Sequence, residues 1–181
     1  MKCLRLFAAL LSLCLVLSGC NSQFSNIQDK KEKTFKVYGY DLKITANSNF
    51  KDDSEDSPWD LQITNNNVYL SVMAYEYIDL SEGQSPKDLY DFHNEDLFSR
   101  RENVSVIEEE ATQTLTGKNI TKTRYSAEAD GNKNYYDTYL IDFTESEVFA
   151  WVLVTGTPSY LKNNTEELES IVYSLETVDQ S

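Results

Sequence analysis

Five carboxylates in one short stretch form the pattern in this chain that comes closest to a metal site. Asp52, Asp53, Glu55, Asp56 and Asp60 lie together in a polar segment. Hard cations such as Ca²⁺ take about six to eight oxygen ligands, which carboxylates on a flexible loop can supply. The spacing lacks the glycine and the terminal glutamate of an EF-hand loop. The stretch is therefore either a divalent-cation site or a solvated acidic loop that keeps the domain soluble.

His93 is the only histidine of the chain, so a zinc site built from several histidines of one chain is excluded. It falls four residues after Leu89 and four before Leu97, inside an apolar helical arc, which predicts a buried or half-buried structural histidine. A role in acid-base catalysis would need a partner within hydrogen-bond reach.

Other catalytic patterns are missing from the sequence. It contains no glycine-rich phosphate loop, no Gly-x-Ser-x-Gly elbow and no His-Glu-x-x-His pattern. The three cysteines stand at positions 3, 14 and 20, near the N-terminus. We therefore expect a protein that is not an enzyme and that has no cofactor.

The first twenty residues indicate export. Lys2 and Arg5 precede an apolar run that ends in Leu17-Ser18-Gly19-Cys20, the pattern of a bacterial lipoprotein signal. An uncleaved anchor is the alternative, but the apolar run is shorter than the roughly 20 residues that span a bilayer. We predict a signal peptide over residues 1–19, lipidation of Cys20 and a polar tether over residues 20–33. Two acyl chains on Cys20 would hold the protein stably on the extracytoplasmic face of the cell membrane.

The net negative charge of the chain disfavours one class of partner, nucleic acid. The formal net charge is −14 at pH 7, and removal of Lys2 and Arg5 with the signal peptide makes it more negative still. Such acidity argues against nucleic acid as a partner, because phosphates would be repelled. We expect attachment to the membrane through the N-terminal lipid and a protein partner at the cell envelope.

The elements that position these residues follow from hydrophobic periodicity. Alternating apolar residues predict strands, Ser85-Pro86 begins a helix that runs to about Arg100, and Asp130-Gly131 predicts a tight hairpin. On this helix Leu89, Tyr90, Phe92, His93 and Leu97 are placed on one apolar side. The segment 47–58 is predicted as a loop, and Glu108-Glu109-Glu110 as an exposed, edge-like part of a strand. Residues 148–154 are apolar on both faces and predict a central strand. The strands are expected over 34–37, 40–44, 61–63, 68–74, 104–115, 121–127, 136–143 and 148–154, with a last helix over 165–175.

This order resembles the Mog1/PsbP-like fold, including the DcrB-like bacterial lipoproteins. The resemblance is carried by Tyr38-Gly39-Tyr40-Asp41-Leu42-Lys43-Ile44 at the start of the domain, by the Pro58-Trp59 turn and by the closing helix, and it covers Thr34 to Val178. It implies an α+β fold with a central antiparallel sheet of about six to eight strands flanked by helices. Members include accessory subunits of photosystem II and a small-GTPase-binding factor, so it implies an accessory or binding role and no catalytic residues.

The sequence thus predicts a single α+β domain over residues 34–181 that acts as a membrane-tethered binding module. One alternative is a protein that binds a small ligand or a divalent cation through loop 52–60 and a groove lined by tyrosines. These tyrosines are Tyr75, Tyr77, Tyr125, Tyr135, Tyr136 and Tyr139. Another alternative is a hydrolase built around His93.

Overall fold

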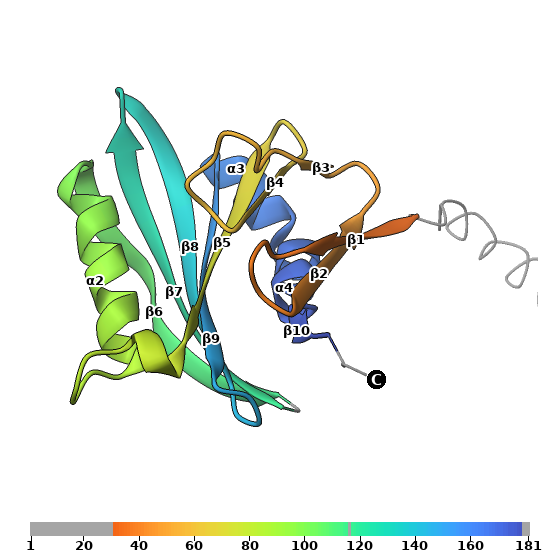
Figure 1. The fold of residues 1–181 in the computed structure, drawn as a ribbon. Coiled ribbons are helices and arrows are strands. Elements are labelled where there is room, and N and C mark those ends of the chain that lie inside the picture. The colour runs from red at the N-terminus through yellow and green to blue at the C-terminus, as the bar shows by residue number, and fades with distance from the viewer. Residues whose placement is uncertain (1–30, 116, 179–181) are drawn as a thin grey trace, which may run out of the picture. The chain divides into compact units, whose positions relative to one another are not determined.

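The computed structural model describes residues 31–115 and 117–178. The predicted signal peptide and the predicted lipidation at Cys20 lie outside the described residues. The described chain forms strands, one short 3-10 helix and three α-helices (Figure 1). In chain order these are β1 (Glu32–Lys36), β2 (Leu42–Asn47), β3 (Lys51–Asp52), β4 (Leu61–Thr64), β5 (Val68–Glu76), η1 (Tyr77–Asp79), α2 (Pro86–Ser99), β6 (Glu102–Leu115), β7 (Lys118–Ala129), β8 (Asn132–Phe143), β9 (Val148–Gly156), α3 (Pro158–Asn163), α4 (Thr165–Tyr173) and β10 (Glu176–Thr177).

Seven strands form the main sheet, in the order β3-β4-β5-β9-β8-β7-β6, and every neighbouring pair is antiparallel. Strand β9 lies between β5 and β8 and is buried on both faces, which confirms the central position predicted for residues 148–154. A second, three-stranded sheet has the order β1-β2-β10. The prediction of an α+β fold with a central antiparallel sheet is confirmed.

The hairpin of β7 and β8 has the two-residue turn that the sequence predicts. Asp130 and Gly131 have φ values of 52° and 75°, and Ala129 pairs with Asn132 across the turn. Two consecutive positive φ values match the right-handed twist of the flanking strands, and Asp-Gly adopts them at low cost. The turn therefore fixes the register of β7 against β8.

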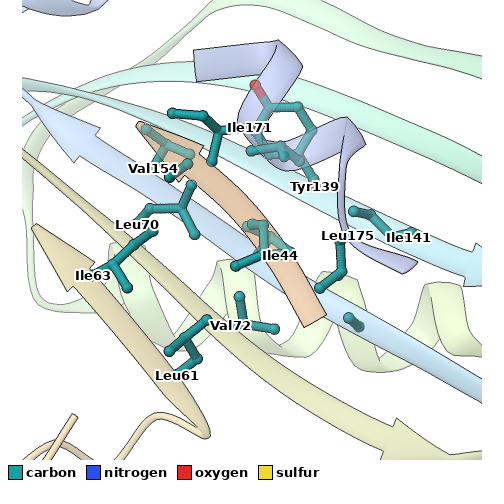
Figure 2. Close-up of a cluster of buried hydrophobic side chains, with 14 of the residues drawn as sticks. Ile44, Leu61, Ile63, Leu70, Val72, Tyr139, Ile141, Val154, Ile171 and Leu175 are labelled. Carbon is teal, nitrogen blue, oxygen red and sulfur yellow. The ribbon is translucent and has the colours of Figure 1, made fainter. Parts of the chain in front are cut away.

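Two hydrophobic clusters cover the two faces of the main sheet. Helix α2 packs on one face, against β8 and β9, while α3, α4 and the small sheet cover the other (Figure 1). On the second face Ile44, Val72 and Ile171 come from β2, β5 and α4 and are buried together (Figure 2). The main sheet is thus the middle of three layers.

Helix α2 begins as predicted. Ser85 is the N-cap residue and forms a reciprocal capping box with Asp88, and Pro86 occupies the first turn. Phe92, however, is 59% exposed, so its predicted place on the apolar side is wrong. Tyr90 faces the sheet as predicted, and Asn94 faces it as well; at about 100° per residue, position 92 lies on the far side from position 90.

Hydrophobic periodicity did not predict several short elements. The predicted loop 47–58 contains β3, the last helix is preceded by α3, and β10 adds a third strand to the small sheet. Strand β1 begins at Glu32, slightly before the predicted Thr34. Elements of two to six residues are too short to show a period, and contacts made by the rest of the fold decide them.

Strand β6 is an edge strand, as predicted for Glu108-Glu109-Glu110, and these residues are exposed. Regular alternation would place Glu108 and Glu110 on one face. A register shift between Glu108 and Ala111 turns them apart. Glu108 pairs with residues of β7, and Glu110 pairs with Lys87 of α2 at 3.1 Å. Within the segments described, no helix has the length and apolar character needed to cross a membrane.

Candidate functional site

Two hollows in the surface meet at Pro58 and Trp59, in the turn between β3 and β4. Asp60 ties this turn to β5, because one of its carboxylate oxygens accepts the backbone N–H of Ala74 at 2.8 Å. We call the smaller one, of about 250 Å³, the aromatic hollow. Its lining residues are Pro58, Trp59, Met73, His93, Asp96, Leu97, Arg100, Arg101 and Trp151.

The floor of the aromatic hollow is a set of stacked rings from three separate elements. The ring centroids of Trp59 and Trp151 are 5.1 Å apart, and those of His93 and Trp151 are 4.7 Å apart with an interplanar angle of 14°. Trp151 is only 4% exposed, and its indole N–H donates to the Asn94 side-chain oxygen at 3.2 Å. These contacts fix flat apolar surfaces that a ring of a ligand can stack on.

His93 is held by a neutral partner. Its Nε2 lies 2.6 Å from the hydroxyl oxygen of Tyr75, and the two rings stack. Burial lowers the pKa of His93, although the charge of Asp96 opposes this effect. Burial, with a smaller contribution from Asp60, raises the pKa of Tyr75 to about 12. Both groups are therefore neutral at pH 7, and His93 has the half-buried packing role that the sequence predicted.

Charged side chains form the rim of the aromatic hollow. Both carboxylate oxygens of Asp96 accept from Arg100 at 2.7 Å, so these two charges offset each other. Arg101 donates to the Tyr136 hydroxyl at 3.3 Å and to the carbonyl of Arg100 at 3.2 Å. Among the described arginines, only Arg101 has no carboxylate partner in an ion pair.

The larger, acidic hollow has a volume of about 670 Å³ and contains part of the predicted acidic site. Its lining residues are Tyr38, Asp52, Ser54, Glu55, Ser57, Pro58, Trp59 and Asp60. Asp53 and Asp56 are not among them. They border an adjoining hollow that Asp52 and Glu55 also line, so four of the five acids lie around it and Asp60 does not.

The predicted metal ligands are directed to different partners. Asp52 accepts from the Ser54 hydroxyl at 2.6 Å, Asp53 from the Gln62 amide at 3.2 Å, and Asp60 from the Ala74 backbone. In residues 31–115 and 117–178, no group of three or more His, Cys, Asp or Glu side chains could hold a metal ion.

Half of the six tyrosines predicted to line a groove are core instead, while Tyr77 is 38% exposed. Tyr135, Tyr136 and Tyr139 are 6%, 3% and 0% exposed. Tyr75 is not a lining residue of the aromatic hollow and reaches it through its contacts with His93 and Met73. A strand pattern alone does not distinguish the tyrosines of a sheet face that is covered by a helix from those of an open face.

Three residues of the candidate site that the sequence did not single out as site residues are Trp59, Trp151 and Arg101. The two tryptophans are the only ones in the chain. One of them follows a proline in a predicted turn, which was a usable signal. Nothing in the sequence, however, brings positions 59, 93 and 151 together, because they lie on a turn, a helix and a central strand.

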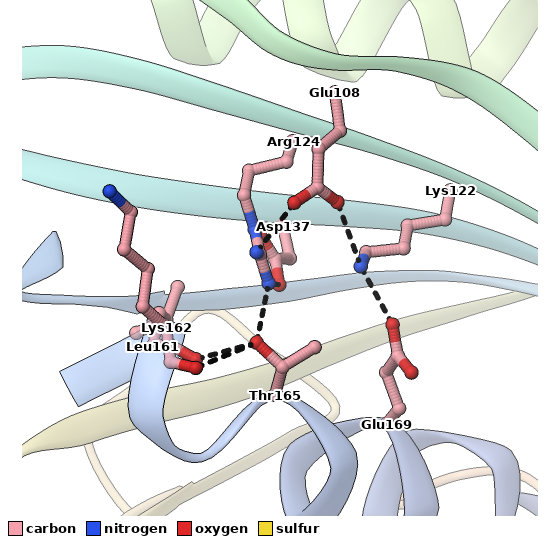
Figure 3. A network of polar contacts seen from close by, with 8 residues as sticks. All are labelled: Glu108, Lys122, Arg124, Asp137, Leu161, Lys162, Thr165 and Glu169. Atoms are coloured by element: carbon pink, nitrogen blue, oxygen red, sulfur yellow. Dashed lines mark hydrogen bonds and ion pairs between the residues drawn. The ribbon is translucent and has the colours of Figure 1, made fainter. Parts of the chain in front are cut away.

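A second concentration of charge joins β6, β7 and β8 to α4 (Figure 3). Arg124 makes a two-point contact with Asp137, at 2.5 and 2.6 Å, and also binds Glu108 at 2.8 Å. Lys122 pairs with Glu169 at 2.7 Å. Because each charge here already has an opposite partner, this network reads as a structural tie between the sheet edge and α4.

No protein-family model matches the sequence, and neither does any curated protein. Solved structures do resemble the fold. CyanoP, the PsbP of the cyanobacterium Synechocystis sp. PCC 6803, superposes with a TM-score of 0.61 at 9% identity, over 88% of this chain and 99% of that one. The Ran-binding protein Mog1p of Saccharomyces cerevisiae gives 0.56 at 17% identity, over 83% and 97%.

The chain has the Mog1/PsbP-like fold. LpqN of Mycobacterium tuberculosis, described as involved in cell envelope biogenesis, is a further structural neighbour, with a TM-score of 0.55 at 12% identity over 82% of this chain and 92% of that one. At such identities the likeness establishes the fold alone. What this Mog1/PsbP-like domain does must be argued from its own surface.

Proposed function

We propose that this protein is a lipid-anchored domain on the extracytoplasmic face of a bacterial cell membrane, and that it acts there as a non-catalytic accessory or binding module. The two hollows that meet at Trp59 are its binding region. The proposal has two parts, the anchor and the binding role, and each has its own support and its own test.

The binding role rests on one observation, which is how His93, the only histidine of the chain, is packed and hydrogen-bonded. His93 stacks on Trp151, and its Nε2 is hydrogen-bonded to Tyr75 rather than to a carboxylate. A general base is poised by a charge partner and a pKa near the working pH, whereas burial moves the pKa of His93 down. Aromatic rings that are held in place beside a hollow are typical of a ligand-binding site.

The anchor is supported by the Leu17-Ser18-Gly19-Cys20 pattern and by the position of the first strand. Strand β1 begins at Glu32, so a short polar segment separates Cys20 from the folded domain. One structural neighbour, LpqN, carries a description that concerns the cell envelope. A soluble domain on a tether next to the membrane is consistent with both observations.

Metabolic labelling with an alkyne analogue of palmitate tests the anchor. The full chain expressed in a bacterium that processes lipoproteins should take up the label and enter the membrane fraction. Cys20→Ser should abolish both, and Cys14→Ser, which removes a cysteine of the predicted signal peptide, should change neither. Labelling that survives Cys20→Ser would contradict the anchor.

A thermal-shift screen of the full chain in detergent against small metabolites tests the binding role. A ligand that binds only the native state raises the melting temperature by mass action. We expect hits whose effect is lost in Trp59→Ala and which are recovered chemically unchanged after incubation. Conversion of a hit into a product that depends on His93 would refute the non-catalytic role.

A further inference from the structure

We infer that the aromatic hollow binds a small planar aromatic ring that bears a carboxylate, with the ring against Trp59 and His93 and the carboxylate on Arg101. This inference rests on the proposed binding role and deepens it, because it assigns a chemical class to one of the two hollows.

The walls of the hollow select the ring. Trp59 and His93 each stack on Trp151, at centroid separations of 5.1 and 4.7 Å, and all three residues line the hollow. Met73 adds a polarizable side chain beside them, and methionine sulfur makes favourable contacts with aromatic rings. A flat, polarizable ring extends this stack with offset or edge-to-face contacts, which a saturated ring makes less well.

The size of the hollow selects a small ligand. Pockets for drug-sized ligands have volumes of about 300–1,000 Å³, and this one is about 250 Å³. One ring with a short substituent fits such a volume. An extended peptide or a long acyl chain does not.

Arg101 selects the charge. A guanidinium has five N–H donors, and two of those of Arg101 are used, by the Tyr136 hydroxyl and by the Arg100 carbonyl. The neighbouring Arg100 is neutralised by Asp96, whereas Arg101 has no ion-pair partner within the described residues. Acidic residues greatly outnumber basic ones in this chain, so an arginine left without a carboxylate is available for one from outside. Arginine and carboxylate match in geometry as well as in charge.

The aromatic hollow also argues against a cationic ligand. Asp96 is the only carboxylate among its lining residues, and both oxygens of Asp96 are engaged by Arg100. A cation would have to displace Arg100 from this contact and would lie close to Arg101. The acidic hollow on the other side of the turn is the place where a cation would be less opposed.

The two indole N–H signals of the chain give a direct readout. Trp59 and Trp151 are its only tryptophans, so a ¹⁵N-labelled full-length sample in detergent shows two indole resonances, assigned by Trp59→Phe and Trp151→Phe. The probes are 4-hydroxybenzoate, its neutral amide, the cationic 4-hydroxybenzylamine and the non-planar cyclohexanecarboxylate. All four are small and soluble in water, which limits their partition into detergent.

We expect 4-hydroxybenzoate to shift both indole signals saturably and to bind about tenfold more tightly than the amide or the saturated acid. Arg101→Gln should remove the preference for the acid over the amide. Arg101→Lys, which keeps the charge and loses the planar fork, should restore part of it. Lys133→Gln, which removes an exposed charge from the β7–β8 hairpin, should leave the preference intact. If the indole signals of the Arg101 variants without ligand match those of the wild type, the variants are folded.

Several outcomes would overturn the inference: equal affinity for acid and amide, tightest binding of the amine, an acid preference that survives Arg101→Gln, or the lack of any saturable shift at millimolar concentration. None of these would contradict lipid labelling at Cys20 or a hit from another chemical class in the thermal-shift screen. Failure here is therefore distinguishable from failure of the proposed function.

Discussion

The hydroxyl oxygen of Tyr75 lies 2.6 Å from Nε2 of His93, and this contact joins the middle strands of the main sheet to α2. Tyr75 also stacks on Phe149 of β9, with ring centroids 5.4 Å apart. The position of the imidazole beside the aromatic hollow is thus set by rings from two strands. Because His93 is packed in this way, we expect its protonation to affect the stability of the fold.

The first prediction is that protonation of His93 makes stability depend on pH. Because burial lowers the pKa of His93 in the folded state, the unfolded chain binds the proton more tightly. The contribution of neutral His93 to stability should be fully present above the pKa of His93 in the unfolded chain, about 6.5. It should be lost as the pH falls from there toward the pKa of His93 in the folded state. Melting temperatures of the wild type and His93→Gln, compared from neutral pH down to about pH 5, measure this. Parallel curves for the two proteins would contradict it.

A pair of tyrosine variants provides the second prediction. Tyr139 is fully buried, and its hydroxyl has no hydrogen-bond partner among the described residues. The buried hydroxyl of Tyr90 contacts the Thr123 and Thr138 hydroxyls at 3.1 and 2.9 Å. Tyr139→Phe should therefore leave the free energy of unfolding within about 0.5 kcal/mol of the wild type or raise it, while Tyr90→Phe should lower it by about 1–2 kcal/mol. Urea unfolding measures both, and the reverse order would refute the reasoning.

The third prediction concerns the ion pair between Arg124 and Asp137. Their side chains are 4% and 1% exposed, and removal of one charge leaves the other buried with only Glu108 beside it. We expect Asp137→Asn to lower the free energy of unfolding by about 3 kcal/mol. Asp91→Asn, which breaks an exposed pair with Lys87, is the matched control and should lower it by less than about 1 kcal/mol. Equal losses in the two variants, measured by denaturant unfolding, would show that burial is not the cause.

The fourth prediction tests the acidic loop. Because Asp52, Asp53 and Asp60 accept hydrogen bonds from different partners, we expect Ca²⁺ or Mg²⁺ at millimolar concentration to leave the melting temperature unchanged beyond the effect of ionic strength. Equal ionic strength of sodium chloride is the control. A specific rise that disappears in Asp52→Asn/Asp53→Asn would contradict this expectation and support the divalent-cation site predicted from the sequence.

The sequence by itself determined the class of fold and the elements with a clear period. The alternation in residues 68–74, the apolar run 148–154, the Asp130-Gly131 turn and the Ser85 cap are local signals, and each appears in the structure as expected. Local signals are reliable here because backbone hydrogen bonding, turn geometry and burial of one face act over a few residues. They also favoured a half-buried role for His93.

Only the tertiary structure decided the binding region. Trp59, His93 and Trp151 are far apart in the chain, and they meet because α2 packs on β8 and β9 while Asp60 ties the turn that carries Trp59 to β5. The same packing leaves Arg101 without an ion-pair partner among the described residues, and it places four of the five acids of loop 52–60 around one hollow that Asp60 does not line. Such relationships depend on which elements become neighbours, and hydrophobic periodicity fixes the buried face of an element but not its neighbour.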